Sequence, residues 1–393
     1  MNICPRNLKV IVPSLFIGFF VFGLWLACHK TLSNDEFYTQ VSSVHGQSYW
    51  QVLKGHTSEG NTSPFFYLLQ KAMCDVFGYH LPESWAQGEW STRDMPSQLF
   101  LRINPDFFMS LTVVSIFYFF ARFYSLWTGF YSLFLSLGSY MVWAYWVEAR
   151  PYALWVFLTS MQALFFLYLI RQEKISRPHW NALTAIHLFL SLTVVFAVSQ
   201  IVIVSFLLWI RFKRRLRHFF LLTLVPVALC IFYYAHSPKY QWWFSLTPEQ
   251  LIRECFSRDR FYVLFIYILC LGLFYVQKKT NAFRLFYDDE ILRGRVYAAF
   301  VFLMVLAAAA ALLVFKWKES AVQNGFPVSS RYFIYLTPVG IIGTTFFSAE
   351  LMRSFRHKRW VQLVLGMGIG YLVFCRFLKV MAEVKGLYPG CFL

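Results

Sequence analysis

The segment that decides the fold is residues 10–28, VIVPSLFIGFFVFGLWLAC, which contains no charged side chain. As an α-helix this segment would be about 28 Å long, close to the ~30 Å hydrocarbon core of a bilayer. Arg6 and Lys9 precede it, so a secretory signal peptide is the alternative. The apolar run is too long for a signal peptide, and no A-x-A cleavage site follows it. We therefore predict a retained first transmembrane helix.

The whole chain shares this apolar character. Of its 393 residues, 58% are hydrophobic and 14% are charged, whereas soluble domains average about 45–50% and 25%. These values exclude a soluble globular protein, and 21% aromatic residues exclude a disordered chain. The formal charge of +17 would suggest nucleic-acid binding in a soluble protein, but in a membrane protein it indicates basic cytoplasmic loops. We predict an all-α polytopic membrane protein, with residues 1–393 forming one integral membrane domain and no nucleic-acid partner.

Further apolar runs are long enough to cross the bilayer, or nearly so when tilted. Residues 181–210 form a run that is long for a single crossing, and both of its flanks are basic. Because Lys and Arg favour the cytoplasmic side, we predict a helical hairpin that turns near Ser199 and Gln200. The result is a bundle of about 11 transmembrane helices, with a cytoplasmic N-terminus and an extracytoplasmic C-terminus. The remaining spans are predicted at residues 103–121, 127–147, 152–170, 219–235, 261–276, 296–315, 332–349 and 360–378.

The largest segment outside these spans is residues 29–102, which we predict to be the first extracytoplasmic loop. Acidic side chains are interspersed there with Trp50, Trp85 and Trp90. This mixture is typical of short helices at the membrane surface, where tryptophan settles at headgroup depth.

Two adjacent acids, Asp35 and Glu36, follow the first span closely and come after Ser33 and Asn34. One interpretation is local: Ser or Asn caps a helix, and the acids are favourably placed in its first turn. The other is catalytic, because a carboxylate at the bilayer surface is suited to deprotonating an acceptor.

A polar loop begins at His56 and ends at Pro64, which is followed by an aromatic-rich helix. Pro64 suits the first position of that helix. His56 is therefore open to a structural interpretation or to a role in substrate binding.

The stretch Glu148-Ala149-Arg150-Pro151-Tyr152 occupies the tight extracytoplasmic turn before the span at residues 152–170. A Glu–Arg pair within the turn is one interpretation, and Tyr152 suits an interfacial anchor. The alternative is that Arg150 binds a lipid phosphate, whose geometry matches the guanidinium fork. Arg331 opens the span at 332–349 and allows the same two interpretations, snorkelling or a second phosphate contact.

Together, these elements resemble the GT-C glycosyltransferases, in particular family 39, which includes the protein O-mannosyltransferases and the lipid A aminoarabinose transferase. The resemblance covers mainly residues 1–170 and topology beyond them. Many relatives read His-Pro-Pro-Leu-Tyr-Tyr where this chain has Thr62-Ser63-Pro64-Phe65-Phe66-Tyr67, so the role of a histidine beside the proline is not transferred to His56. The matching residues are Asp35-Glu36, Ser63 to Leu69, Leu101-Arg102-Ile103-Asn104-Pro105, Glu148 to Leu154, and Arg331-Tyr332.

The resemblance implies transfer of a sugar from a polyprenyl-phosphate donor to a protein, lipid A or glycan acceptor at the extracytoplasmic face of a bacterial cell membrane. It implies catalytic carboxylates, with Asp35 as the base or acceptor-orienting group and Glu36 or Glu148 in support. For substrate binding it implies Arg150 and Arg331 at the phosphate, and from the sequence we also predict Tyr152 and His56 as substrate-binding residues. A divalent metal occurs in some of these enzymes, but no cluster of ligands in this sequence requires one.

A transporter or flippase of lipid-linked sugars is the alternative class. Such proteins often carry ionisable groups inside the membrane and helices interrupted at the bilayer midplane. Here the acids gather in the predicted outside loops and are nearly absent from the spans, which favours chemistry at the membrane surface.

Overall fold

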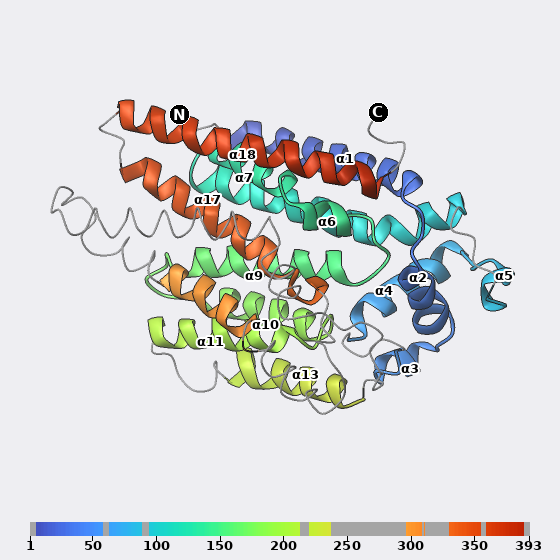
Figure 1. The fold of residues 1–393 in the computed structure, drawn as a ribbon. Coiled ribbons are helices and arrows are strands. Elements are labelled where there is room, and N and C mark those ends of the chain that lie inside the picture. Colours follow the sequence, from blue (N-terminus) through green and yellow to red (C-terminus); the bar gives the residue numbers. More distant parts are fainter. Residues whose placement is uncertain are drawn as a thin grey trace.

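The structure, a computed structural model, describes a helical protein. It covers residues 5–57, 63–88, 94–212, 220–236, 296–308, 310, 330–354 and 359–388. Of the residues described, 83% are helical and none lies in a strand. Long helices lie side by side, and a group of short helices gathers at one end (Figure 1). The all-α prediction is confirmed for this part of the chain.

In the described part of the chain, four helices contain segments long and apolar enough to cross a membrane, as an integral membrane protein requires. They are α1 (Pro5–His29), α6 (Met95–Phe123), α9 (Tyr152–Leu169) and α18 (Arg359–Leu387). Helix α6 packs against both α1 and α9. The buried residues of α6 and α9 supply much of the core, whereas α1 keeps apolar side chains such as Val10 and Ile17 exposed. Exposed apolar side chains on a spanning helix suit contact with lipid.

Further helices belong to the described part of the bundle. Their bounds are α7 Leu126–Leu137, α8 Tyr140–Tyr145, α10 Arg177–Ser191, α11 Ala197–Phe212, the π-helix η2 Phe220–Leu224, α13 Val225–His236, the 3₁₀ helix η4 Ser330–Phe333 and α17 Leu336–Ser354. A further apolar helix spans Val296–Ala308. The predicted span at residues 261–276 lies outside the residues described.

The run at 181–210 is divided into two helices, α10 and α11, as predicted. The predicted turn near Ser199 and Gln200 is wrong, because both residues lie in the first turn of α11. The break comes earlier because backbone N–H groups from a distant part of the chain donate to the carbonyls freed at the end of α10. Ser63 N donates to the Thr193 carbonyl at 3.2 Å, and Phe65 N donates to the Leu192 carbonyl at 2.7 Å. Backbone groups at a helix end need such partners when they are buried.

The predicted span at 127–147 is also two helices, α7 and α8, separated at Gly138 and Ser139. Trp143 Nε1 donates to the Leu137 carbonyl at 2.7 Å and so satisfies a group released at the end of α7. A single continuous helix was predicted because apolar character persists through the break.

Residues 29–102 fold into short helices, which Figure 1 shows together at one end of the bundle. They are α2 Asn34–Tyr38, the π-helix η1 Thr39–His45, α3 Tyr49–Leu53, α4 Phe65–Phe77 and α5 Glu83–Ala86. Buried Phe37 and Trp85 pack edge to face at 4.5 Å between ring centroids and join α2 to α5. This small apolar cluster fixes α2, which carries two of the three candidate carboxylates, Asp35 and Glu36.

Candidate active site

The first turn of α2 places Asp35 and Glu36 directly beyond the end of α1. Ser33 caps the helix: its hydroxyl oxygen accepts from Glu36 N at 3.3 Å, and Ser33 N donates to Glu36 Oε2 at 2.9 Å. This reciprocal pair is a capping box, which satisfies backbone donors at the helix start. The interpretation that Ser33 caps a helix with both acids in its first turn is therefore confirmed. The Asp35 side chain takes no part in this capping box and contacts other residues.

Glu36 is a buried scaffold residue. Its oxygens accept from Arg102 Nε at 3.0 Å and Arg102 Nη2 at 2.9 Å, and Oε1 also accepts from Ala149 N at 2.8 Å. Both side chains are at most 1% exposed. Burial alone would raise the pKa of Glu36, but the charge and hydrogen bonds of Arg102, helped by Lys30 and Ala149 N, lower it overall. Glu36 thus stays ionised and ties α2 to α6.

The same contacts fix the turn between α8 and α9. Ala149 N donates to Glu36, and the Ala149 carbonyl accepts from Gln40 Nε2 at 3.1 Å. Because Ala149 is held on both sides, its neighbours Glu148 and Arg150 have a set backbone position beside α2.

Asp35 is the meeting point of two distant arginines. Arg150 Nη1 lies 2.6 Å from Asp35 Oδ2, and Arg331 Nη1, at the start of η4, donates to the same oxygen. These arginines stand 115 and 296 positions from Asp35 in the chain. Arg150 is 7% exposed and Asp35 is 51% exposed, so the carboxylate lies at the edge of the site. Oδ1 accepts no hydrogen bond from any residue described.

The charge around Asp35 determines its protonation. Burial would raise the pKa of its carboxyl, but the guanidinium groups of Arg150 and Arg331 outweigh this and hold the pKa below its usual value. Asp35 is therefore an anion at neutral pH, and among the described residues both of its arginine partners bind the same oxygen, Oδ2.

Glu148 has the opposite environment. Its side chain is 15% exposed, and Lys30 Nζ and Arg150 Nη1 each approach it only to 3.9 Å. Burial raises the pKa of the Glu148 carboxyl, and these cations compensate only in part. Two nearby carboxyl groups whose pKa values are pushed apart are a frequent property of acid–base sites.

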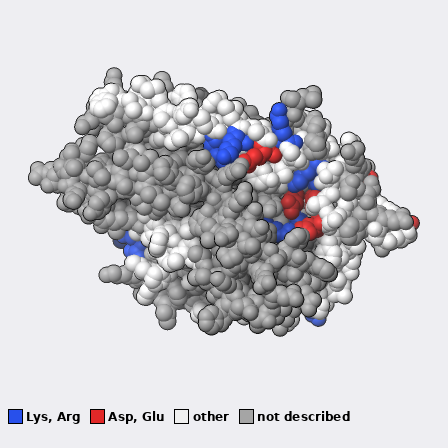
Figure 2. All heavy atoms as spheres, viewed as in Figure 1, with Lys and Arg blue, Asp and Glu red and all other residues white. Residues whose placement is uncertain are grey.

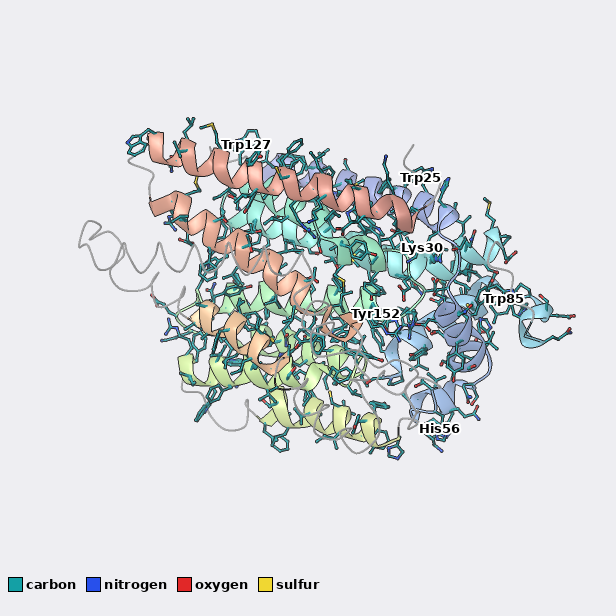
Figure 3. All side chains as sticks on the ribbon, in the orientation of Figure 1. Trp25, Lys30, His56, Trp85, Trp127 and Tyr152 are labelled. Carbon is teal, nitrogen blue, oxygen red and sulfur yellow. The ribbon has the colours of Figure 1, made fainter. Side chains whose placement is uncertain are left out.

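Tyr152 forms the aromatic wall of the site. The Arg150 guanidinium lies over its ring at 5.1 Å, and the Tyr145 ring lies 4.9 Å from it. A guanidinium against an aromatic face is favoured and held in orientation. Tyr152 thus helps to position Arg150, and Figure 3 shows Tyr152 and Lys30 on the same side of the molecule as the short helices.

His56 is not brought to this site. It is exposed in the loop after α3, and its backbone N–H donates to the Gln51 carbonyl at 3.0 Å. Figure 3 shows it at the lower edge of the molecule, away from Tyr152. The substrate-binding interpretation of His56 therefore gains nothing from its position.

The described residues of the site are together weakly cationic. Four basic side chains, Lys30, Arg102, Arg150 and Arg331, face three carboxylates, Asp35, Glu36 and Glu148. Figure 2 shows basic and acidic side chains side by side toward the right of the visible face, near α2 and the end of α18. Among the residues described, no three His, Cys, Asp or Glu side chains are grouped to hold a metal ion. A group of this kind suits a singly or doubly charged anion such as a phosphate ester.

Sequence reasoning missed the parts played by Arg102 and Lys30. Arg102 was noticed only within a matching motif, although an arginine near the start of a long apolar helix needs a buried carboxylate partner. Lys30 directly follows α1; its Nζ donates to the Ala144 carbonyl at 2.8 Å. Its proximity to Glu148 could not be read from sequence because the two residues are far apart in the chain.

Comparison of the chain with protein-family models and with curated proteins finds no match. The geometry of the site is therefore the basis for the functional proposal.

Proposed function

We propose that the protein is a membrane glycosyltransferase that moves a sugar from a polyprenyl-phosphate donor to a protein, lipid or glycan acceptor at the extracytoplasmic face. The observation that supports this proposal is the contact of the half-exposed Asp35 carboxylate with two arginines from distant parts of the chain, Arg150 in the turn before α9 and Arg331 in η4. Such an arrangement provides a proton acceptor beside a clamp for a phosphate group.

The reaction needs both parts. The acceptor oxygen forms a bond to the anomeric carbon while the bond from that carbon to the phosphate oxygen breaks. The phosphate leaves with the bonding electron pair, and a carboxylate takes the proton of the acceptor hydroxyl. Fixed guanidinium groups stabilise the negative charge that develops on the phosphate. A positioned base lowers the barrier to attack.

The two parts are linked through Asp35. A donor phosphate bound by Arg150 and Arg331 would draw off part of the positive charge that these arginines direct at the Asp35 carboxylate. Withdrawing that charge raises the basicity of Asp35. Donor binding would thus activate the base, with Oδ1 facing the acceptor hydroxyl.

The other candidate residues take supporting roles in this proposal. Glu36 positions α2 and the turn at Ala149 through its buried contacts with Arg102 and Ala149 N. Glu148 is a second proton acceptor, because burial raises its pKa. Tyr152 orients Arg150 through its ring.

The alternative, a transporter of lipid-linked sugars, is favoured by one observation. Asp106 is completely buried within α6, where Oδ1 accepts from Trp146 Nε1 at 2.9 Å and from Ser110 at 3.3 Å. An acid inside a membrane span often marks a translocation path. Asp106 is accommodated by the absence of a side chain at Gly23, so its place also has a packing explanation.

The test compares the glycolipids and glycoproteins of three kinds of cells by mass spectrometry. They lack the gene, carry the intact gene, or carry Asp35→Asn, which keeps the size of the side chain and removes its charge. We expect one glycosylated product to disappear without the gene. With Asp35→Asn it should form at least ~10²-fold more slowly, the scale of losing a general base.

Immunoblotting of the membrane fraction controls for protein level. Near-normal product formation by Asp35→Asn would contradict the enzymatic proposal. The transporter would be favoured if cells carrying Asp106→Asn lose the product and cells carrying Asp35→Asn retain it.

A further inference from the structure

A second cationic site lies at the opposite end of α6 from Asp35. A cavity of about 330 Å³ opens between α1 and α6 and is lined by Leu8, Lys9, Val12, Pro13, Tyr118 and Arg122. Two of these residues are basic and one carries a hydroxyl, while the others are apolar. The two cations come from different helices, so the fold brings them together.

The cations of this cavity are not neutralised within the described part of the chain. Lys9 and Arg122 are exposed, and neither forms an ion pair with a described carboxylate. Like charges placed together raise the electrostatic energy, which a bound anion relieves. Tyr118 adds a hydroxyl that can donate a hydrogen bond to an anionic oxygen.

The position of the cavity identifies the source of the anion. Arg102 and Arg122 are on the same helix, and the rise from one to the other is ~30 Å, about the thickness of the hydrocarbon core. With Arg102 at one face of the bilayer, Arg122 is at headgroup depth on the other. Apolar Val10 and Ile17 on α1 are 67% and 60% exposed and can contact acyl chains beside the cavity.

We infer that the cavity between α1 and α6 binds the phosphate group of an anionic membrane lipid through Lys9, Arg122 and Tyr118. Basic pockets between membrane helices are suited to acidic headgroups. This site is independent of the proposed sugar transfer, since it lies at the other end of the bundle and shares no residue with it.

The test is native mass spectrometry of the full-length protein in detergent, titrated with phosphatidylglycerol or with phosphatidylcholine of the same acyl chains. We expect the protein to retain phosphatidylglycerol in preference. Combining Lys9→Ala with Arg122→Ala should weaken its binding about tenfold or more, given the contribution of each cation near a membrane surface. Combining Lys9→Arg with Arg122→Lys should preserve binding.

The matched control combines Lys174→Ala with Arg177→Ala. It removes the same charge just before and at the start of α10, from exposed residues that do not line the cavity. Binding by this control should change less than about twofold. An equal loss in the control would overturn the inference in favour of diffuse attraction.

Two further outcomes would also overturn it. One is equal binding of the two lipids. The other is displacement of phosphatidylglycerol by inorganic phosphate at a matched concentration, which would identify a site for soluble anions. If the double alanine variant does not fold, Val12→Phe serves instead, because it fills the cavity without changing the charge. It should reduce the binding of phosphatidylglycerol and leave the binding of phosphatidylcholine unchanged.

Discussion

The two ends of α6 carry arginines in opposite circumstances. Arg102 is fully buried and donates five hydrogen bonds, to the carboxylate of Glu36 and to the carbonyls of Ala27, Lys30 and Thr31. Arg122 is exposed and forms no ion pair with a described carboxylate. The same residue type on one helix thus fixes the architecture at one end and leaves charge available at the other. The presence of a partner carboxylate decides which role an arginine takes.

The sharpest test of this contrast is removal of each arginine. Arg102→Ala leaves Glu36 buried and unpaired, which should cost about 3–5 kcal/mol of folding free energy. Arg122→Ala should change stability by no more than about 0.5 kcal/mol, because Arg122 is exposed and forms no ion pair with a carboxylate in the described residues. Thermal unfolding of the purified protein in detergent measures both.

A combined Arg102→Met and Glu36→Leu variant serves as the control, since it removes the stranded charge. It should recover part of the lost stability, as buried pairs often tolerate joint apolar replacement. Equal unfolding temperatures for Arg102→Ala and Arg122→Ala would show that the Arg102 contacts do not hold the short helices in place.

The sequence predicts features that depend on neighbouring residues, but not those that depend on contacts between residues far apart in the chain. Apolar runs and capping signals are local, so α1, α9 and the start of α2 could be predicted from the chain. The position of the break before α11 could not, because Ser63 and Phe65, at the start of α4, supply its hydrogen bonds from a distant part of the chain. The pairing of Glu36 with Arg102 was missed for the same reason. Asp35, Arg150 and Arg331 were expected at one site on the strength of the resemblance, and the fold shows both arginines in contact with Asp35 Oδ2.

The phosphate clamp provides the next test. Arg150→Lys retains a charge but loses the paired donors of the guanidinium, so we expect transfer at limiting donor to fall about tenfold. Arg150→Ala should lower it about 10–100-fold, the scale of a charge-assisted hydrogen bond. Initial rates at several donor concentrations measure the effect once mass spectrometry has identified the product.

Arg177→Lys is the matched control, because Arg177 is exposed at the start of α10 and does not contact Asp35. Full activity of Arg150→Lys would indicate that the residue only extends its charge to the membrane surface, as snorkelling predicts.

The smallest expected effect is on pH dependence, and it tests whether donor binding activates Asp35. A base must be deprotonated, so the rate falls as the pH drops through its pKa. In the free protein the arginines hold the pKa of Asp35 below its usual value. The acid limb of kcat/KM, which reports the free enzyme, should therefore lie below the usual carboxyl range.

The acid limb of kcat reports the donor-bound enzyme, in which the phosphate shares both guanidinium groups, and should lie at higher pH. Arg331→Gln removes one of the two charges that lower the pKa of Asp35, so its kcat/KM limb should move up toward the kcat limb. The charge-retaining Arg331→Lys variant should move that limb less. If the two acid limbs coincide in the intact protein and Arg331→Gln does not move them, another group takes the proton. Glu148, whose pKa is raised by burial, would then be the next residue to substitute.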